Sequence, residues 1–262
     1  MGAQGILCRA LIPPLDEVIQ LAAPDGLGRR SANTRSKGKK LTVLRLTLPT
    51  KQLCRIARAL DRHLYPCLRT VFFPIPPDST FDLRKNYSEQ LPKTFHFKTA
   101  LIGTRAGRAR RVSDALGVTD LLKSERLRLL GERLTGKQLE ANPACQVICY
   151  EAGDFCGPHN DHHPEQSLLR DGYVDVHIML SEPTVMSQLL VYEKRRGLLN
   201  AVEEVGSGLG IAVYQLPFWH YTTPLVPRSG AHRARRWVFL ASYIIQRHER
   251  RSLDRPATNV RF

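Results

Sequence analysis

The sequence of 262 residues lacks several features that would assign it to a common class of protein. No apolar run approaches the ~18–20 residues that a membrane-spanning helix needs. The N-terminus lacks the basic segment and the clean apolar core of a secretory signal. None of the six cysteines forms a C-x-x-C pair, which argues against a structural zinc site, and their scatter does not indicate a disulfide framework. We therefore expect a soluble, cytoplasmic protein whose thiols are free.

Positive charge is concentrated in the first half of the chain. The formal net charge is +15, and residues 1–139 contain 26 Lys and Arg against 11 Asp and Glu. Residues 140–262 contain 13 of each kind. Basic patches attract phosphates, carboxylates and nucleic acids, so this asymmetry favours an anionic substrate. Because no RNA-binding motif with interleaved aromatics is present, nucleic acid ranks below an acidic small molecule, a lipid headgroup, a sugar or an acidic carrier.

The texture of the sequence divides the chain into four regions. Residues 1–40 are an N-terminal extension that ends in a basic loop, and residues 41–138 are mixed and rich in helical patterns. Residues 139–246 contain short β-like runs separated by Gly, Pro and Asp, and residues 247–262 form a basic tail. Regularly spaced short strands are typical of a sandwich or barrel. The strands expected in the third region are 144–150, 173–180, 187–193, 210–216 and 235–245.

Local patterns within residues 41–138 predict both strands and helices. The stretch 112–136 reads as one or two helices, with Ser113 and Thr119 as N-caps and Gly131 and Gly136 as stops. The other expected segments are a strand at 41–48, a helix at 49–65, a proline-rich loop at 71–80 and a strand at 93–103.

Three histidines and an aspartate fall within positions 159–163, although the chain has only nine histidines. Side chains alternate along an extended strand, so we expect His159 and Asp161 to point to one side, which His163 can share, and His162 to the other. His162 and His163 are expected to face solvent or to lie behind the ligands. Two histidines and one carboxylate form the facial triad of non-haem Fe(II) oxygenases, which leaves open positions on the metal. The third ligand must come from elsewhere, and an ordinary polar turn is the alternative.

The surroundings of the H-x-D pair strengthen the metal hypothesis. The stretch CQVICYEAGDFCGPHND combines a tyrosine-bearing strand, a Gly-Asp turn and the pair itself, and YVDVHIMLSE, SQLLVYE, GLGIAVYQLPFWHYTTPLVP and RRWVFLASYII follow in order. This arrangement resembles the iron(II)- and 2-oxoglutarate-dependent dioxygenases, in their prolyl-hydroxylase-like branch, over residues 139–245. The resemblance implies an α+β protein with a double-stranded β-helix, or jelly-roll, core at 139–246 and supporting N-terminal helices.

The resemblance also implies that His159, Asp161 and a distal histidine bind Fe(II). His220 is the preferred distal ligand, because it resembles the family's strand-end histidine followed by a proline. His177 is the second candidate, although its apolar neighbours favour a core or supporting role. His232 is the third, because the arginines around it would repel a bound cation.

The far carboxylate of 2-oxoglutarate needs a cationic partner, and the planar fork of arginine matches a carboxylate. In the last expected strand, Arg236 shares a face with small and aliphatic residues, whereas Arg235 shares the other face with bulky aromatics. A narrow pocket favours the first face, so we choose Arg236, then Arg235, then Arg233. The resemblance implies that the Tyr150 hydroxyl also reaches this carboxylate. A half-buried aromatic on a β surface is the alternative for Tyr150.

The implied reaction makes the protein an oxidoreductase. It would consume O2 and 2-oxoglutarate and yield succinate, CO2 and a substrate hydroxylated at an unactivated C–H bond. A zinc hydrolase on the same ligands is one alternative; it would need a base such as Glu165, and the chain has no H-E-x-x-H motif. A non-catalytic jelly-roll binding module is the other.

Overall fold

The structure is a computed structural model of the chain. Of the N-terminal extension at residues 1–40, the structure describes only Asp16 and Lys40. The expected basic tail at residues 247–262 lies outside the described residues. The described residues are 16, 40–75, 93–103, 107–162, 166, 169, 172–195, 198–206 and 208–246.

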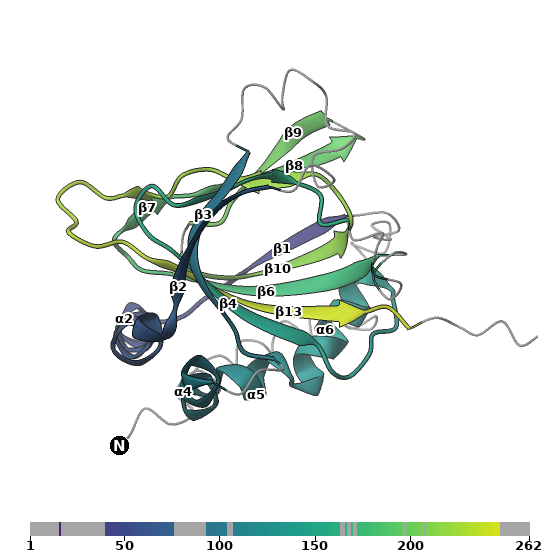
Figure 1. Cartoon of the computed structure of the whole chain (residues 1–262), viewed down its shortest axis with the longest axis horizontal. Coiled ribbons are helices and arrows are strands. Elements are labelled where there is room, and N and C mark those ends of the chain that lie inside the picture. Colours follow the sequence, from purple (N-terminus) through teal and green to yellow (C-terminus); the bar gives the residue numbers. More distant parts are fainter. Residues whose placement is uncertain are drawn as a thin grey trace, which may run out of the picture.

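An eleven-stranded antiparallel sheet forms the framework and bends into two halves (Figure 1). The first half consists of β1 (Leu41–Leu46), β10 (Leu209–Leu216), β6 (Tyr173–Ser181), β13 (Arg236–Ile244), β4 (Ala144–Tyr150) and β3 (Thr94–Leu101). The second half consists of β5 (Phe155–His159), β11 (His220–Thr222), β8 (Leu189–Arg195) and β9 (Leu198–Glu204). The two halves are joined because β3 pairs with both β4 and β5. This bent antiparallel sheet is the expected double-stranded β-helix.

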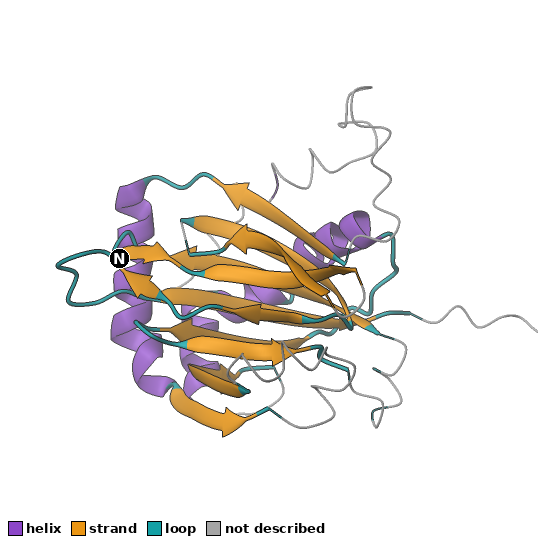
Figure 2. Cartoon of the chain, turned by 90° about the horizontal axis from the view of Figure 1, so that it is seen from above, coloured by secondary structure: helices purple, strands orange, loops and turns teal. Residues whose placement is uncertain are grey.

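The remaining elements are one edge strand, a small sheet and a layer of helices. β2 (Arg69–Pro74) pairs with β3, and β7 (Val185–Ser187) pairs with β12 (Val226–Pro227). The helices cover one face of the first half of the sheet (Figure 1, Figure 2). They are α2 (Thr50–Ala59) with its continuing turns η1 (Leu60–Leu64) and η2 (Tyr65–Cys67), α4 (Arg108–Leu116), α5 (Val118–Leu122) and α6 (Glu125–Thr135). No helix among the described residues is both long and apolar enough to cross a membrane.

Strand alternation gives β13 two different faces. Trp237, Phe239, Ala241 and Tyr243 lie in one hydrophobic cluster with leucines of α5 and α6. Val238 belongs to a second cluster, on the inner side of the bent sheet. Successive side chains of a strand point to opposite faces. One set of residues therefore attaches the helices, and the alternate set lines the interior.

The helix ends differ in part from those predicted. Gly136 ends α6 with a φ of 68°, as expected for a left-handed C-cap. Gly131 lies inside α6, however, where a Cβ would be 3.0 Å from the Leu139 side chain, so the glycine lets α6 approach the sheet closely. The predicted cap Ser113 lies inside α4, and Ser124 is the residue whose side chain accepts from a backbone N–H of α6.

Most predicted strands are confirmed, and one predicted loop is wrong. The segment 71–80 was expected as a proline-rich loop, but residues up to Pro74 belong to β2. Its apolar residues pair with β3, because Phe73 lies opposite Phe95. Strands β1, β2 and β3 come from residues 41–138 yet pair with strands of residues 139–246, so the two regions share one sheet.

Candidate metal centre and its cavity

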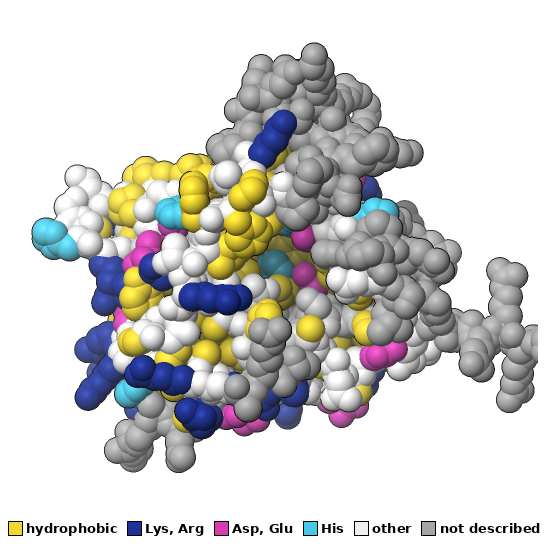
Figure 3. Space-filling model, in the orientation of Figure 1, with side chains coloured by type: hydrophobic (Ala, Val, Ile, Leu, Met, Phe, Trp, Pro, Cys, Tyr) yellow, Lys and Arg dark blue, Asp and Glu magenta, His cyan; other side chains and the backbone are white. Residues whose placement is uncertain are grey.

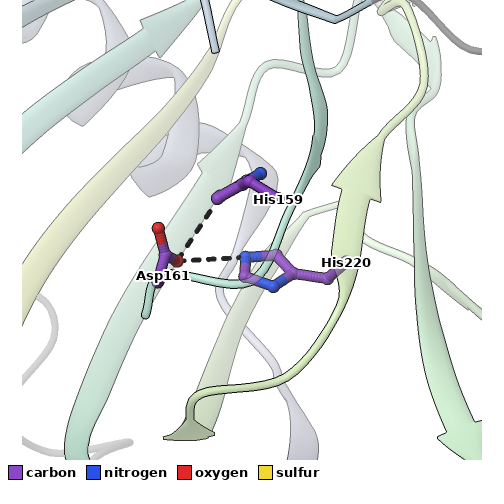
Figure 4. A group of neighbouring side chains, drawn as sticks. All are labelled: His159, Asp161 and His220. Carbon is purple, nitrogen blue, oxygen red and sulfur yellow. Dashed lines mark ion pairs between the residues drawn. The ribbon is translucent and has the colours of Figure 1, made fainter. Parts of the chain in front are cut away.

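Two histidines meet across a pair of strands of the second half of the sheet (Figure 4). His159 is the last residue of β5 and His220 is the first residue of β11. They lie directly opposite each other in the antiparallel pairing, with ring centroids 4.3 Å apart. The strand register thus brings together two side chains that are far apart in the sequence.

Asp161 reaches the histidines through a turn. β5 ends at His159, and Asp161 has a φ of 54°, in the left-handed region that few residues other than glycine adopt. Its Oδ2 lies 3.4 Å from Nε2 of His159 and 3.5 Å from Nε2 of His220. His159 and Asp161 do point to one another, but the predicted cause, alternation along an extended strand, is wrong.

Both imidazoles are oriented by backbone carbonyls. Nδ1 of His159 donates to the carbonyl oxygen of Gly157 at 2.7 Å, and Nδ1 of His220 donates to that of Phe218 at 3.0 Å. A carbonyl can only accept, so the proton of each neutral ring lies on Nδ1. In the neutral form of each ring, Nε2 is therefore the nitrogen without a proton, and it faces Asp161. Such carbonyl contacts are the usual way in which a metal-binding histidine is held.

Charge on the two rings is coupled through Asp161. Burial and the neighbouring His159 lower the pKa of His220 to about 3. Burial also opposes charge on His159, but the Asp161 carboxylate and the Cys156 side chain together outweigh burial and raise the pKa of His159 well above its usual value. The cluster therefore favours one positive charge beside the carboxylate and keeps His220 neutral, as a metal ligand must be.

The donor set fits a divalent metal ion. One ligand atom from each of His159, Asp161 and His220 lies within 4.8 Å of the other two. Two imidazoles and a carboxylate suit Fe(II), and they also suit catalytic Zn(II). The group offers three ligand atoms from the described residues, one from each side chain. An ion bound there would therefore keep coordination positions open for other molecules.

A cavity of about 940 Å³ lies beside the three residues, which contribute to its lining. Figure 3 shows a hollow in this face of the molecule, with histidine and acidic side chains at its bottom and hydrophobic side chains beside it. Phe95 and Phe97 of β3 are among the aromatic lining residues, and Arg236 lines the cavity from β13. The cavity thus combines an apolar wall with a few polar groups, which is typical of a small-molecule site.

Arg236 is buried in this cavity, with an exposed fraction of only 2%. Its Nη1 donates to Oε1 of Gln188 at 2.9 Å, whereas its Nε has no hydrogen-bond partner among the described residues. No carboxylate in the described part of the chain forms an ion pair with it, and burial lowers the pKa of this guanidinium. A buried cation without a counter-charge is costly. The arrangement therefore suits an anionic ligand.

Two further side chains surround Arg236. Tyr150 lies opposite it in the pairing of β4 with β13, is buried, and lines the cavity. Gln188 is fully buried, and its Nε2 donates to the carbonyl oxygens of Thr223 at 2.9 Å and Asp154 at 3.2 Å. These two bonds turn the Gln188 oxygen toward Arg236. Sequence reasoning missed Gln188, because nothing distinguishes a single glutamine between two strands.

The other two candidate arginines lie away from the cavity. Arg235 forms ion pairs with Asp61 at 2.7 Å and with Glu151 at 3.0 Å, and its guanidinium stacks on Tyr65, 3.5 Å from the ring centroid. Arg233 is also paired with Asp61, at 2.8 Å. Of the three arginines named from the sequence, Arg236 alone is among the residues that line the cavity.

The remaining histidine candidates have other positions. His177 lies on β6 and lines the cavity, but it does not belong to the group of possible ligands, and its Nε2 is 3.7 Å from Oδ2 of Asp175. His232 is exposed in the turn before β13. His162 is half-buried and follows Asp161. His163 and Glu165 lie outside the described residues.

No protein-family model and no curated protein matches the chain, whereas solved structures do. The non-heme, alpha-ketoglutarate-dependent epimerase SnoN of nogalamycin biosynthesis is 15% identical, with a TM-score of 0.51 over 85% of this chain and 84% of its own. A Pseudomonas putida prolyl-4-hydroxylase is 15% identical, with a TM-score of 0.43 over 89% and 100%. The carbocyclase SnoK of nogalamycin biosynthesis is 12% identical, with a TM-score of 0.46 over 77% and 79%.

Likeness at this identity concerns the fold alone. The resemblance stated from the sequence is confirmed at this level. The chain has the double-stranded β-helix fold of the non-haem, 2-oxoglutarate-dependent oxygenases.

Proposed function

We propose that the protein is an Fe(II)- and 2-oxoglutarate-dependent dioxygenase that hydroxylates an unactivated C–H bond. The overall reaction converts R–H, O2 and 2-oxoglutarate into R–OH, succinate and CO2. One observation carries the proposal: a two-histidine, one-carboxylate group and a buried arginine line the same cavity, and no described carboxylate pairs with that arginine. A 2-keto diacid needs both features, a metal for its keto-acid end and a cation for its other end.

The proposed roles follow from the contacts of each residue. His159, Asp161 and His220 hold the ion, and bound iron supplies the activation of O2. The carbonyls of Gly157 and Phe218 fix the two rings, so that each Nε2 is available to the ion. Because the two imidazoles are already held in this way, binding of the ion would require no rearrangement of the two strands.

The co-substrate would be held at the other side of the cavity. Arg236 binds the far carboxylate of 2-oxoglutarate and is held in place by Gln188. Tyr150, opposite Arg236, directs its hydroxyl at the same carboxylate. Phe95 and Phe97 form an apolar wall that limits access of water to the reacting groups.

We further propose that the substrate is anionic and is captured by basic residues of the first half of the chain. The net charge of +15 motivates this, and Lys123 is a basic residue in the lining of the cavity. On α4, Arg108 and Arg111 are exposed, whereas Arg110 is engaged by Asp114 and by the carbonyls of Ile102 and Gly103. Lys123→Glu should raise KM for the substrate, and KM should rise with salt. A KM that is unaffected by either change contradicts this part of the proposal.

We also propose that the protein works in the cytoplasm. Cys145, Cys149 and Cys156 are buried free thiols, and no disulfide joins cysteines of the described residues. A reducing compartment keeps such thiols in this state. Fractionation of the native cells would test this location.

The decisive experiment is anaerobic addition of Fe(II) and then 2-oxoglutarate to the metal-free protein. We expect the weak visible charge-transfer band of a 2-keto acid chelated to iron, and succinate formation once O2 is admitted. His232→Ala is the matched control and should give the native band. If Zn(II) instead supports hydrolysis and no band forms, a zinc hydrolase is the better description. If neither metal supports turnover and no band forms, a binding module is.

A further inference from the structure

Asp175 and His177 form a polar pair on the inner face of β6 that the proposed chemistry does not use. Their neighbours Val174, Val176 and Ile178 pack against the helices, so alternation turns Asp175 and His177 to the other side. Both residues line the cavity.

Two polar atoms of the pair have no hydrogen-bond partner among the residues that the structure describes. They are Asp175 Oδ1 and His177 Nε2, and both are buried, with Asp175 only 6% exposed. The Asp175 carboxyl as a whole interacts with the side chains of His177 and Ser242. Nε2 of His177 lies 3.7 Å from Oδ2 of Asp175, which is longer than a hydrogen bond. A buried polar atom that lacks a hydrogen bond destabilises the folded state. Apolar residues at these positions would avoid that cost, so the pair has a use other than packing.

The pair lies close to the metal group. The ring of Tyr214 is 4.3 Å from that of His177 and 5.4 Å from that of His220, so one aromatic ring separates His177 from a ligand. Ser242 of β13 lies opposite Asp175, and Leu240 lies opposite His177. A molecule in this part of the cavity can therefore touch the pair while a carbon atom of it lies near the metal.

The pair also lies away from the co-substrate anchor. Arg236 is paired with Ser181 on β6, and His177 and Asp175 are four and six residues from Ser181 along that strand. At ~3.3 Å per residue these steps correspond to roughly 13 and 20 Å. A five-carbon diacid bound to Arg236 is too short to reach Asp175. This part of the cavity remains for the substrate.

We propose that Asp175 and His177 bind an O–H or N–H donor group of the substrate, and so position it for oxidation. This inference rests on the proposed function and specifies its substrate: an apolar body that carries a hydroxyl or amino group near the oxidised carbon. A carboxylate oxygen can only accept, so Asp175 requires a donor. The apolar body fits Phe95, Phe97 and Leu240, which line the same cavity. An anionic group elsewhere on the molecule is compatible with it.

The test uses three molecules of the same shape: 1-adamantanol, 1-adamantylamine and 1-fluoroadamantane. Their dissociation constants are measured by calorimetry on the anaerobic Fe(II)·2-oxoglutarate protein and on the metal-free protein. We expect the alcohol or the amine to bind at least tenfold more tightly than the fluoro compound. Asp175→Leu should remove this preference without changing the visible band.

Further variants distinguish the two donor classes and control for folding. Asp175→Asn keeps an acceptor oxygen but loses the charge, so it should preserve preference for the alcohol and lose preference for the amine. His177→Gln should weaken the preferred donor at least threefold. Met179→Leu, on the same face of the same strand, should behave as the native protein. A misfolded Asp175→Leu protein leaves Asp175→Asn and His177→Gln to decide.

Two results would overturn the inference: equal binding of all three molecules to the native protein, or a donor preference of native size in both Asp175→Leu and His177→Gln. A normal band in those cases leaves the proposed function standing. If the native protein gives no band but prefers a donor that Asp175→Leu loses, the proposed function fails and the polar pair still stands as a binding site.

Discussion

The two faces of strands β6 and β13 differ in almost every respect, although their residues alternate along the same backbone. The face toward the helices is apolar, and its residues include Trp237, Phe239 and Tyr243. The face toward the cavity carries Arg236 and Asp175, together with histidine and serine side chains. Neighbouring residues on one strand therefore have different surroundings: one set packs against the helices, and the other lines the cavity that we propose as the ligand site. Substitutions of adjacent residues can test this division.

The largest expected effect is at the proposed metal site, which lines the same cavity from strands β5 and β11. His220→Ala should lower iron affinity by roughly a hundredfold or more, because removing a ligand costs at least as much as removing one of its supporting contacts. Turnover should then be abolished. Competition with a coloured chelator measures the affinity. His162→Ala is the control and should bind iron nearly normally. If His220→Ala retains iron and His177→Ala loses it, the distal ligand is His177 and not His220.

The helix-covered face should show the largest loss of stability. Phe239 is fully buried among the helices, so Phe239→Ala should lower the free energy of unfolding by about 3–5 kcal/mol. Urea denaturation of the metal-free protein measures this. Leu240→Ala, on the cavity face and only half-buried, should cost much less. Equal losses at the two positions would remove the distinction between the faces.

Two adjacent arginines provide the sharpest form of the comparison. Arg236→Gln should lower 2-oxoglutarate affinity at least about tenfold with little effect on iron binding, because loss of a buried charged partner costs ~2–5 kcal/mol. Arg235→Gln should leave that affinity unchanged and lower stability, since Asp61 and Glu151 lose their partner. Titration of the visible band measures the affinity. The opposite pattern would transfer the anchor to Arg235.

The smallest effects concern two serines of the helical layer. Ser124 accepts from the N–H of Leu127 at the start of α6, so Ser124→Ala should cost about 1 kcal/mol. Ser113 is buried inside α4, and its hydroxyl has no hydrogen-bond partner in the part of the chain that the structure describes. Ser113→Ala should therefore be neutral or slightly stabilising. Thermal unfolding measures both changes in stability. A larger loss of stability in Ser113→Ala than in Ser124→Ala would favour Ser113 as the helix cap.

Much of the sheet could be predicted, because side chains alternate between the two faces of a strand and this alternation shows in consecutive residues of the sequence. The strand containing Arg236 was predicted together with its two faces, since alternation needs only the sequence. Asp161 was expected beside His159, but the left-handed turn was not, because aspartate is compatible with several backbone conformations. Gln188 could not be found, because its partners Arg236 and Asp154 are distant in the sequence. Short strands such as β11 give too few residues for a pattern.

The direct opposition of His159 and His220 has a consequence for the lifetime of the protein. An ion held by both residues would cross-link β5 to β11, two segments that the unfolded chain does not keep together. A ligand that binds only the folded state adds about 2.7 kcal/mol to its stability at a hundred times its dissociation constant. Resistance to proteolysis would then follow the supply of metal. The abundance of the protein in a cell would depend on iron before any substrate is met.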